Sequence, residues 1–109
     1  MDLNKSILAK SAKVLKPMNF TGQQVLNSSF SQQEHSNVLS WQADLNGQNT
    51  EKYRIYLVEG KTQSLLVELS ADFLDYIHRN VEKNKKYKYA LVAVDGMNRE
   101  SEAIYTKIE

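Results

Sequence analysis

The sequence predicts an all-β domain, a sandwich of about seven short strands. From Pro17 onward, runs rich in β-branched and aromatic residues alternate with polar, turn-prone stretches. No segment between these runs has the length and periodicity of a helix, which argues against βαβ units. The chain of 109 residues fits one domain that can bury a core without metal or disulfide bonds.

The strands are expected where apolar and β-branched residues concentrate. Polar stretches separate them, and we expect SSFSQQEHS at 28–36 and ADLNGQNTE at 43–51 to be connecting loops. The second contains Asn46 and Gly47, a turn signal because both residue types tolerate positive φ. The predicted strands span about 19–26, 36–43, 52–59, 63–69, 74–80, 86–95 and 102–108.

The first sixteen residues differ in character from the rest. Residues 4–16, NKSILAKSAKVLK, carry four lysines and apolar residues at about helical spacing. They fit an interdomain linker that rests on a neighbour, or a basic helix on a membrane surface. The first residues lack the continuous apolar run of a signal peptide. We therefore predict an N-terminal linker or extension at 1–16 and a sandwich domain at 17–109, with Pro17, the only proline, at its start.

Alternation within the strands predicts the core. Successive side chains of a strand point to opposite faces, so Leu39 and Trp41 share one face of NVLSWQA. The same parity assigns further residues of two other strands to the interior: Tyr53, Ile55, Leu57, Tyr87, Tyr89, Leu91 and Ala93.

The stretch KKYKYALVAVDG at 85–96 has two interpretations. It is either a basic and aromatic strip that binds nucleic acid or a strand whose tyrosines face inward. Fourteen basic and thirteen acidic residues leave a formal charge of +1, which gives no broad field to attract a polyanion. We interpret it as a strand with solvated lysines and expect no nucleic-acid partner.

Several of these segments together resemble the fibronectin type III family. They are Pro17 before the first strand, VLSW at 38–41, KYRIYLVEG at 52–60 and VEKNKKYKYALVAVDGMNRES at 81–101. The resemblance covers about residues 17–108. It implies a seven-stranded immunoglobulin-like sandwich.

The resemblance also implies roles for single residues. Val81 stands where the family usually has a core leucine, and we expect it in the core. Tyr87 matches the family's tyrosine corner, in which the ring packs inside and the hydroxyl bonds back to the backbone of the preceding loop.

His78 departs from the family, which usually has an inward-facing aliphatic residue there. It fits a metal ligand, a general base or a hydrogen-bonded structural histidine; the only other histidine, His35, lies in a different connection. If His78 is partly buried, desolvation favours its neutral form, so acid is expected to destabilise the domain. The chain has no cysteine, no nucleophile elbow and no phosphate-binding glycine loop. We expect no catalytic residue, cofactor or metal.

The outward positions of two strands are apolar, at Tyr56, Val58, Ala90, Val92 and Val94. If the strands pair as the family implies, these side chains form one patch. One interpretation is that the patch is internal, covered by an adjoining strand or by the N-terminal segment, with Ile7, Leu8, Val14 and Leu15 as candidate cover. The other is that a neighbouring domain or another chain docks on it.

The function expected from these observations is that of a non-catalytic fibronectin type III module, a spacer or positioning domain in a larger protein. By family analogy that protein is extracellular, on the cell surface or periplasmic. The alternative is a recognition module that binds protein or glycan through loops 44–50 and 95–101, or through the outer face around Tyr56 and Val92. Neighbouring domains are the expected partners, no membrane span is expected, and the isolated domain is expected to be a monomer. The candidate interaction residues are Tyr56, Val92, Val94, Asn46, Met97, Asn98 and Arg99.

Overall fold

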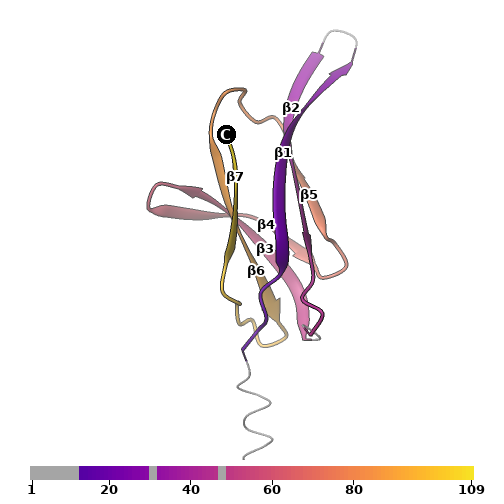
Figure 1. Ribbon diagram of the computed structural model, residues 1–109, viewed down its shortest axis with the longest axis vertical. Coiled ribbons are helices and arrows are strands. Elements are labelled where there is room, and N and C mark those ends of the chain that lie inside the picture. The colour runs from indigo at the N-terminus through magenta and orange to yellow at the C-terminus, as the bar shows by residue number, and fades with distance from the viewer. Residues whose placement is uncertain (1–12, 30–31, 47–48) are drawn as a thin grey trace, which may run out of the picture.

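The computed structural model describes residues 13–29, 32–46 and 49–109. Within these residues the chain forms seven strands in two antiparallel sheets (Figure 1). The strands are β1 (Met18–Ser29), β2 (Gln32–Gln42), β3 (Thr50–Glu59), β4 (Thr62–Ser70), β5 (Asp75–His78), β6 (Tyr87–Asp95) and β7 (Ile104–Ile108).

One sheet has the order β1-β2-β5 and the other the order β4-β3-β6-β7. The prediction of a seven-stranded all-β sandwich is therefore confirmed. The seven strands run alternately up and down. Because seven is an odd number, β1 begins at the lower end of the molecule in Figure 1 and β7 ends at the upper end. We call these the lower end and the upper end of the sandwich. The described parts of the β2–β3 loop and loop 96–103 lie at the lower end, and connection 79–86 lies at the upper end.

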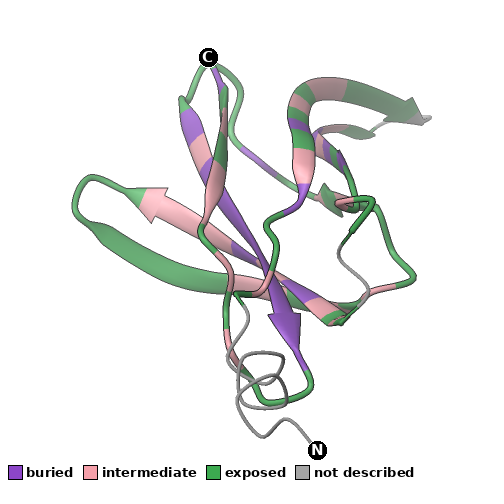
Figure 2. Cartoon of the chain, turned by 60° about the horizontal axis from the view of Figure 1, so that its bottom comes forward, coloured by how far each residue is buried: buried purple, intermediate pink, exposed green. Residues whose placement is uncertain are grey.

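The interior contains the residues that alternation assigned to it. Trp41 packs edge-to-face against Phe20 and Tyr53, with ring centroids 6.2 and 5.5 Å apart. Strand β6 is buried along nearly its whole length, on both faces of its sheet (Figure 2). The eight residues expected in the core are all buried: Leu39, Trp41, Tyr53, Ile55, Val81, Tyr87, Tyr89 and Leu91.

The loop expected at 28–36 is the main departure in secondary structure. Strand β1 continues to Ser29 and β2 begins at Gln32, and the register runs through Asn27↔Glu34 to that end. Together they form a two-stranded ribbon that projects at the upper end (Figure 1). Most of its side chains are exposed, so its strand structure comes from backbone pairing, which polar side chains do not reveal.

The two sheets approach closely where β1 passes β7. A Cβ on Gly22 would lie 2.9 Å from Cδ2 of Leu39 and 3.0 Å from Cδ1 of Ile108. These distances are too short for an ordinary contact, so glycine is required by space rather than by backbone angle.

Candidate functional site

The upper half of the interior is built around two tyrosines. The hydroxyl of Tyr87 accepts a hydrogen bond from the backbone N–H of Glu82 at 2.8 Å, which is the tyrosine-corner contact that the family resemblance implies. Val81 is buried beside this connection, and its backbone N–H donates to the carbonyl of His35 at 2.9 Å. These contacts hold connection 79–86 against the sandwich.

Tyr89 connects two polar side chains in the same half. Its hydroxyl accepts a hydrogen bond from Nδ2 of Asn37 at 2.7 Å and lies 2.7 Å from Nδ1 of His78. Asn37 is fully buried, and its Oδ1 accepts a hydrogen bond from Gln24. Since the hydroxyl proton then needs an acceptor, a neutral His78 with a free Nδ1 completes the network.

Burial lowers the pKa of His78, and the nearby positive charge of Lys85 lowers it further. Both causes favour the neutral ring that accepts from Tyr89. The rings of Tyr87 and Tyr89 stand edge-on to His78, with centroids 5.9 and 5.7 Å away. The geometry is that of a structural histidine.

Asn37 was not among the residues singled out from the sequence. It has the same parity as Leu39 and Trp41 in NVLSWQA, so its inward position could have been read from alternation. Its role could not, because the partner Tyr89 lies fifty-two positions away along the chain.

The apolar patch expected on the outer face does not exist as an exposed surface. Ala90, Val92 and Val94 are 1%, 4% and 0% exposed. Their cross-strand neighbours on β3 include the long side chains of Arg54, opposite Val92, and Tyr56, opposite Ala90. Small side chains on a central strand are covered when longer ones flank them, so Val92 and Val94 are not accessible docking residues.

Arg54 forms the centre of this outer face. Its Nε donates to Glu68 at 2.8 Å and its Nη1 to Glu100 at 3.0 Å, while its Nη2 donates to Oδ1 of Asn98. Tyr56 donates its hydroxyl to Glu100. Arg54, Glu68, Glu100, Asn98 and Tyr56 thus form a cluster whose charges are paired internally.

The loop between β6 and β7 is held by one aspartate. Oδ1 of Asp95 accepts from the backbone N–H groups of Met97 at 3.0 Å and Arg99 at 2.9 Å. Oδ2 of Asp95 accepts from the guanidinium of Arg99, and these contacts lower the pKa of Asp95. Asn98 has a φ of 63° and points its amide oxygen at Arg54. Met97 remains 65% exposed, so it is the accessible apolar side chain of this loop.

The loop between β2 and β3 is described in part. The backbone N–H of Asn46 donates to Oδ1 of Asp44 at 2.8 Å, an Asx-type turn. Leu45 at this turn is 90% exposed. Gly47, the second residue of the expected turn signal, lies outside the described residues.

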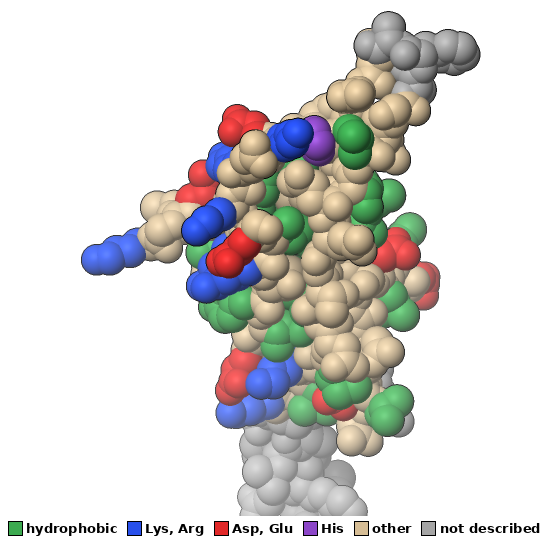
Figure 3. Space-filling view, turned by 45° about the horizontal axis from the view of Figure 1, so that its top comes forward, with side chains coloured by type: hydrophobic (Ala, Val, Ile, Leu, Met, Phe, Trp, Pro, Cys, Tyr) green, Lys and Arg blue, Asp and Glu red, His purple; other side chains and the backbone are tan. Residues whose placement is uncertain are grey.

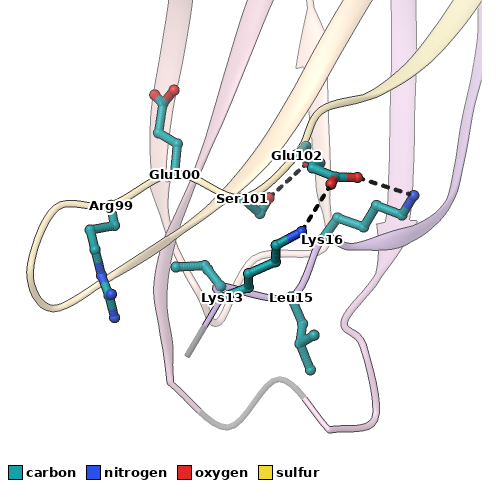
Figure 4. Close-up of a pocket in the computed structure, with 8 residues that line it drawn as sticks. Lys13, Leu15, Lys16, Arg99, Glu100, Ser101 and Glu102 are labelled. Atoms are coloured by element: carbon teal, nitrogen blue, oxygen red, sulfur yellow. Dashed lines mark hydrogen bonds and ion pairs between the residues drawn. The ribbon is translucent and has the colours of Figure 1, made fainter. Parts of the chain in front are cut away.

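A pocket of about 410 Å³ lies at the lower end, between residues 13–16 and the loop at 99–102 (Figure 4). Lys13 and Lys16 approach the two carboxylate oxygens of Glu102 at 3.6 and 3.9 Å. Val14 packs against the core, whereas Leu15 is 38% exposed. Of the residues expected to cover an apolar face, Ile7 and Leu8 lie outside the described part of the chain.

Neither a metal centre nor a membrane helix is found in the part of the chain that the structure describes. Within it, no three histidine, aspartate or glutamate side chains gather as metal ligands. No helix there is long and apolar enough to cross a bilayer.

The fold and these contacts define a class: a seven-stranded immunoglobulin-like sandwich with a tyrosine corner and internally paired surface charges. No protein-family model and no curated protein sequence matches the chain. Solved structures do match. FN3tt is 25% identical, with a TM-score of 0.68, and 85% of this chain covers 89% of it.

Two further solved structures match the chain, one over nearly its full length and one over a small part of its length. The Fn3-like protein from Clostridium thermocellum is 18% identical with a TM-score of 0.66, and 90% of this chain covers 94% of it. The glycoside hydrolase domain of Endo-D from Streptococcus pneumoniae R6 is 20% identical with a TM-score of 0.68. There, 91% of this chain covers 15% of the other chain. The structural neighbours of the chain are thus fibronectin type III-like domains, and at least one matching region is a small part of a larger protein.

Proposed function

We propose that the chain is a non-catalytic spacer and positioning module of a larger protein. The observation that carries the proposal is the match to Endo-D, in which nearly all of this chain corresponds to a small part of a glycoside hydrolase structure. When a small module is a minor part of a larger structure, its role is to support the domains to which it is attached. The internally paired charges on the outer face support the same role, because they leave few groups free for chemistry.

The topology supplies what a spacer needs. The chain enters at the lower end beside Glu102 and leaves at the upper end, where Ile108 pairs with Tyr87. Attached domains are then held at opposite ends of a packed sandwich, with the tyrosine corner fixing the upper connection.

Exposed apolar side chains at the lower end offer a contact for a preceding domain. Leu15, Leu45 and Met97 are 38%, 90% and 65% exposed. They come just before β1, after β2 and after β6, which are the connections of the lower end. Apolar area of this kind contributes about 25 cal/mol per Å² when a neighbour covers it. The proposed assignment of residues 1–16 to a linker fits this arrangement.

We place the parent protein outside the cytoplasm, secreted, on the cell surface or in the periplasm. The glycoside hydrolase match is the support, because glycan substrates are abundant there. Fractionation of the source cells, with an antibody against this domain, tests the placement; recovery in the cytoplasmic fraction alone would refute it.

The spacer role is tested by fusing a donor and an acceptor fluorescent protein to the two ends. A spacer gives one narrow distance distribution that is unchanged by glycans or added proteins. A flexible glycine–serine linker of matched mean length is the control and gives a broad distribution. An equally broad distribution for the folded module would contradict the proposal.

A recognition role for the lower loops is the second candidate, favoured by the way Asp95 fixes its loop and presents Met97. Met97→Ser and Asn46→Ala change exposed residues without touching the Arg54 contacts. If the parent's binding or activity falls in these variants while their stability is unchanged, recognition replaces the spacer role. Asn98 and Arg99 are unsuitable for this test because both hold the structure together.

A further inference from the structure

A groove of about 310 Å³ opens at the upper end, away from the loops of the lower end. One wall is the end of β3 with the turn that follows it, and the other is the end of connection 79–86, the start of β6 and the end of β7. Figure 3, which brings the upper end forward, shows several lysine and arginine side chains on one side of this end, with acidic side chains among them.

The groove exists because the four-stranded sheet divides there. Pairing between β3 and β6 ends at Leu57↔Tyr89. Beyond that pair, β3 continues to Glu59 and pairs with β4, while β6 starts at Tyr87 and pairs with β7. Each wall therefore includes a strand with one edge facing the groove, and within residues 13–29, 32–46 and 49–109 no strand pairs with that edge.

Four lysines line the groove: Lys85, Lys86, Lys88 and Lys107. Two carboxylates, Glu59 and Glu109, line it as well. In the described part of the chain, none of the four ammonium groups lies within 4.0 Å of a carboxylate, whereas Lys13, Lys16 and Lys52 each do. Four ammonium groups against two carboxylates leave the lining of the groove with an excess of two positive charges and, among the described residues, no direct ion pair.

Two of these lysines are held by aromatic rings rather than by acids. The Nζ atom of Lys85 lies 5.3 Å from the ring centroid of Tyr87, and that of Lys88 lies 4.8 Å from that of Tyr105. A ring contact positions the ammonium group while leaving its hydrogen-bond donors available to a ligand.

We propose that this groove binds an extended acidic peptide segment, whose carboxylates meet the four lysines and whose backbone lies along the free strand edges. This goes beyond the spacer role, which requires no ligand at the upper end. An extended chain suits the site because its N–H and C=O groups match those of a strand edge.

A polyanionic sugar fits the groove less well. Carbohydrate binding commonly uses an exposed aromatic face, and Tyr87, the aromatic residue that lines the groove, is 7% exposed. The apolar part of the wall is aliphatic, from Leu57 and Val58. An acidic peptide can use aliphatic walls, strand edges and ammonium groups together.

The pKa of His78 is expected to report ligand binding in the groove. Its pKa is lowered first by burial and then by the charge of Lys85; the rings of Tyr87 and Tyr89 stand edge-on to it, and Asn37 is its partner on the neighbouring strand. Carboxylates bound at Lys85 would offset that charge. The pKa of His78 should therefore rise when the groove is filled.

The experiment is an NMR titration of the full chain with acetylated, amidated hexaglutamate at low ionic strength. We expect saturable shifts centred on Val58, Lys86 and Lys107, and a higher pKa of the His78 ring in the bound state. The double variant K86Q/K107Q should weaken binding about tenfold, since each exposed ion pair contributes modestly. Added salt should weaken it further.

The matched control is K13Q/K16Q, which removes the same charge from the lower end. The ion pair that the described residues offer these two exposed lysines is Glu102, so we expect the fold to be retained and peptide binding to be unchanged. If both double variants weakened peptide binding equally, the effect would be one of net charge alone, and the proposed site would be overturned.

Two other probes test the ligand class. Tetragalacturonate carries carboxylates on a sugar backbone, and inorganic phosphate carries charge alone. We expect both to bind at least tenfold more weakly than the peptide. Tetragalacturonate binding as tightly as the peptide would overturn the peptide assignment, as would full competition by phosphate at equal charge. Absence of saturable peptide shifts would also overturn it. None of these outcomes bears on the fluorescence test of the spacer role.

Discussion

The two halves of the sandwich interior are filled by different chemistry. At the lower end, Phe20, Trp41 and Tyr53 pack edge-to-face, and the indole nitrogen of Trp41 has no hydrogen-bond partner among the described residues. At the upper end, Asn37 and His78 meet the hydroxyl of Tyr89 in a buried network. The lower half depends on contact area and shape, which are insensitive to pH. The upper half depends on each polar group having its partner, so a proton can disturb it.

The largest effect is expected in the apolar half. Trp41→Ala should lower the free energy of unfolding by about 3–5 kcal/mol, because it leaves a cavity between Phe20 and Tyr53. Urea unfolding followed by circular dichroism measures this loss. Trp41→Phe, which keeps an aromatic ring, should lose less. A loss under about 1 kcal/mol for Trp41→Ala would mean that this half is not the main source of stability.

The polar half should be nearly as sensitive to the loss of one oxygen atom. Tyr89→Phe keeps the ring but leaves the amide of Asn37 and the ring nitrogen of His78 without their shared partner, costing about 1–3 kcal/mol. Tyr105→Phe removes a hydroxyl from a residue that is 49% exposed and should be neutral. Equal stability of the two variants would remove the distinction between the halves.

Gly22 lies between the two halves, opposite Leu39. Gly22→Ala should cost about 1–3 kcal/mol, because the added methyl group overlaps Leu39 and Ile108 in a closely packed position. Gly96→Ala is the control, since its Cβ would meet only the carboxylate end of Glu51, which can move aside. Thermal unfolding of both variants compares them directly. A destabilised Gly96→Ala with an unchanged Gly22→Ala would contradict the close approach of β1 and β7.

The smallest effect is the pH response of the upper half. The folded-state pKa of His78 lies below its ordinary value of 6.5, so the unfolded chain binds the proton more readily. Its contribution to stability is full above pH 6.5 and is lost as the pH falls through that value towards the lower folded pKa. Denaturant unfolding between about pH 7.5 and 5.5 measures the slope.

His78→Gln keeps a polar group at this position and should flatten the slope in that window. The carboxylates whose pKa is lowered by ion pairs or hydrogen bonds, Glu34, Glu68 and Asp95, act at more acidic pH because their ordinary pKa values are 4.5 or below. A slope between pH 7.5 and 5.5 that persists in His78→Gln would rule out His78 as its cause.

Much of the fold could be predicted from local patterns in the sequence. Strand parity places Leu39, Trp41 and Tyr89 inside because side chains alternate along any strand. The family resemblance around Tyr87 implies its corner, and the hydroxyl does bond to the backbone N–H of Glu82, five positions earlier in the chain. These features depend on neighbours within a few positions.

The candidate sites were less predictable. Val92 and Val94 point outward as alternation predicts, yet they are buried because Arg54 and the side chains around it cover the face. Whether an outward residue is accessible depends on the length of side chains on the next strand, which alternation within one strand does not contain.

The sequence by itself determined the strand number, the inward faces and the family resemblance, since these follow from periodicity and short spacings. Only the tertiary structure decided which charges are paired. Lys52 and Arg54 share Glu68 across two strands, whereas Lys86 and Lys107 form no direct ion pair among the described residues although Glu59 and Glu109 line the same groove. The physical reason is that a charge is compensated by what lies within a few ångströms, and those neighbours come from distant parts of the chain.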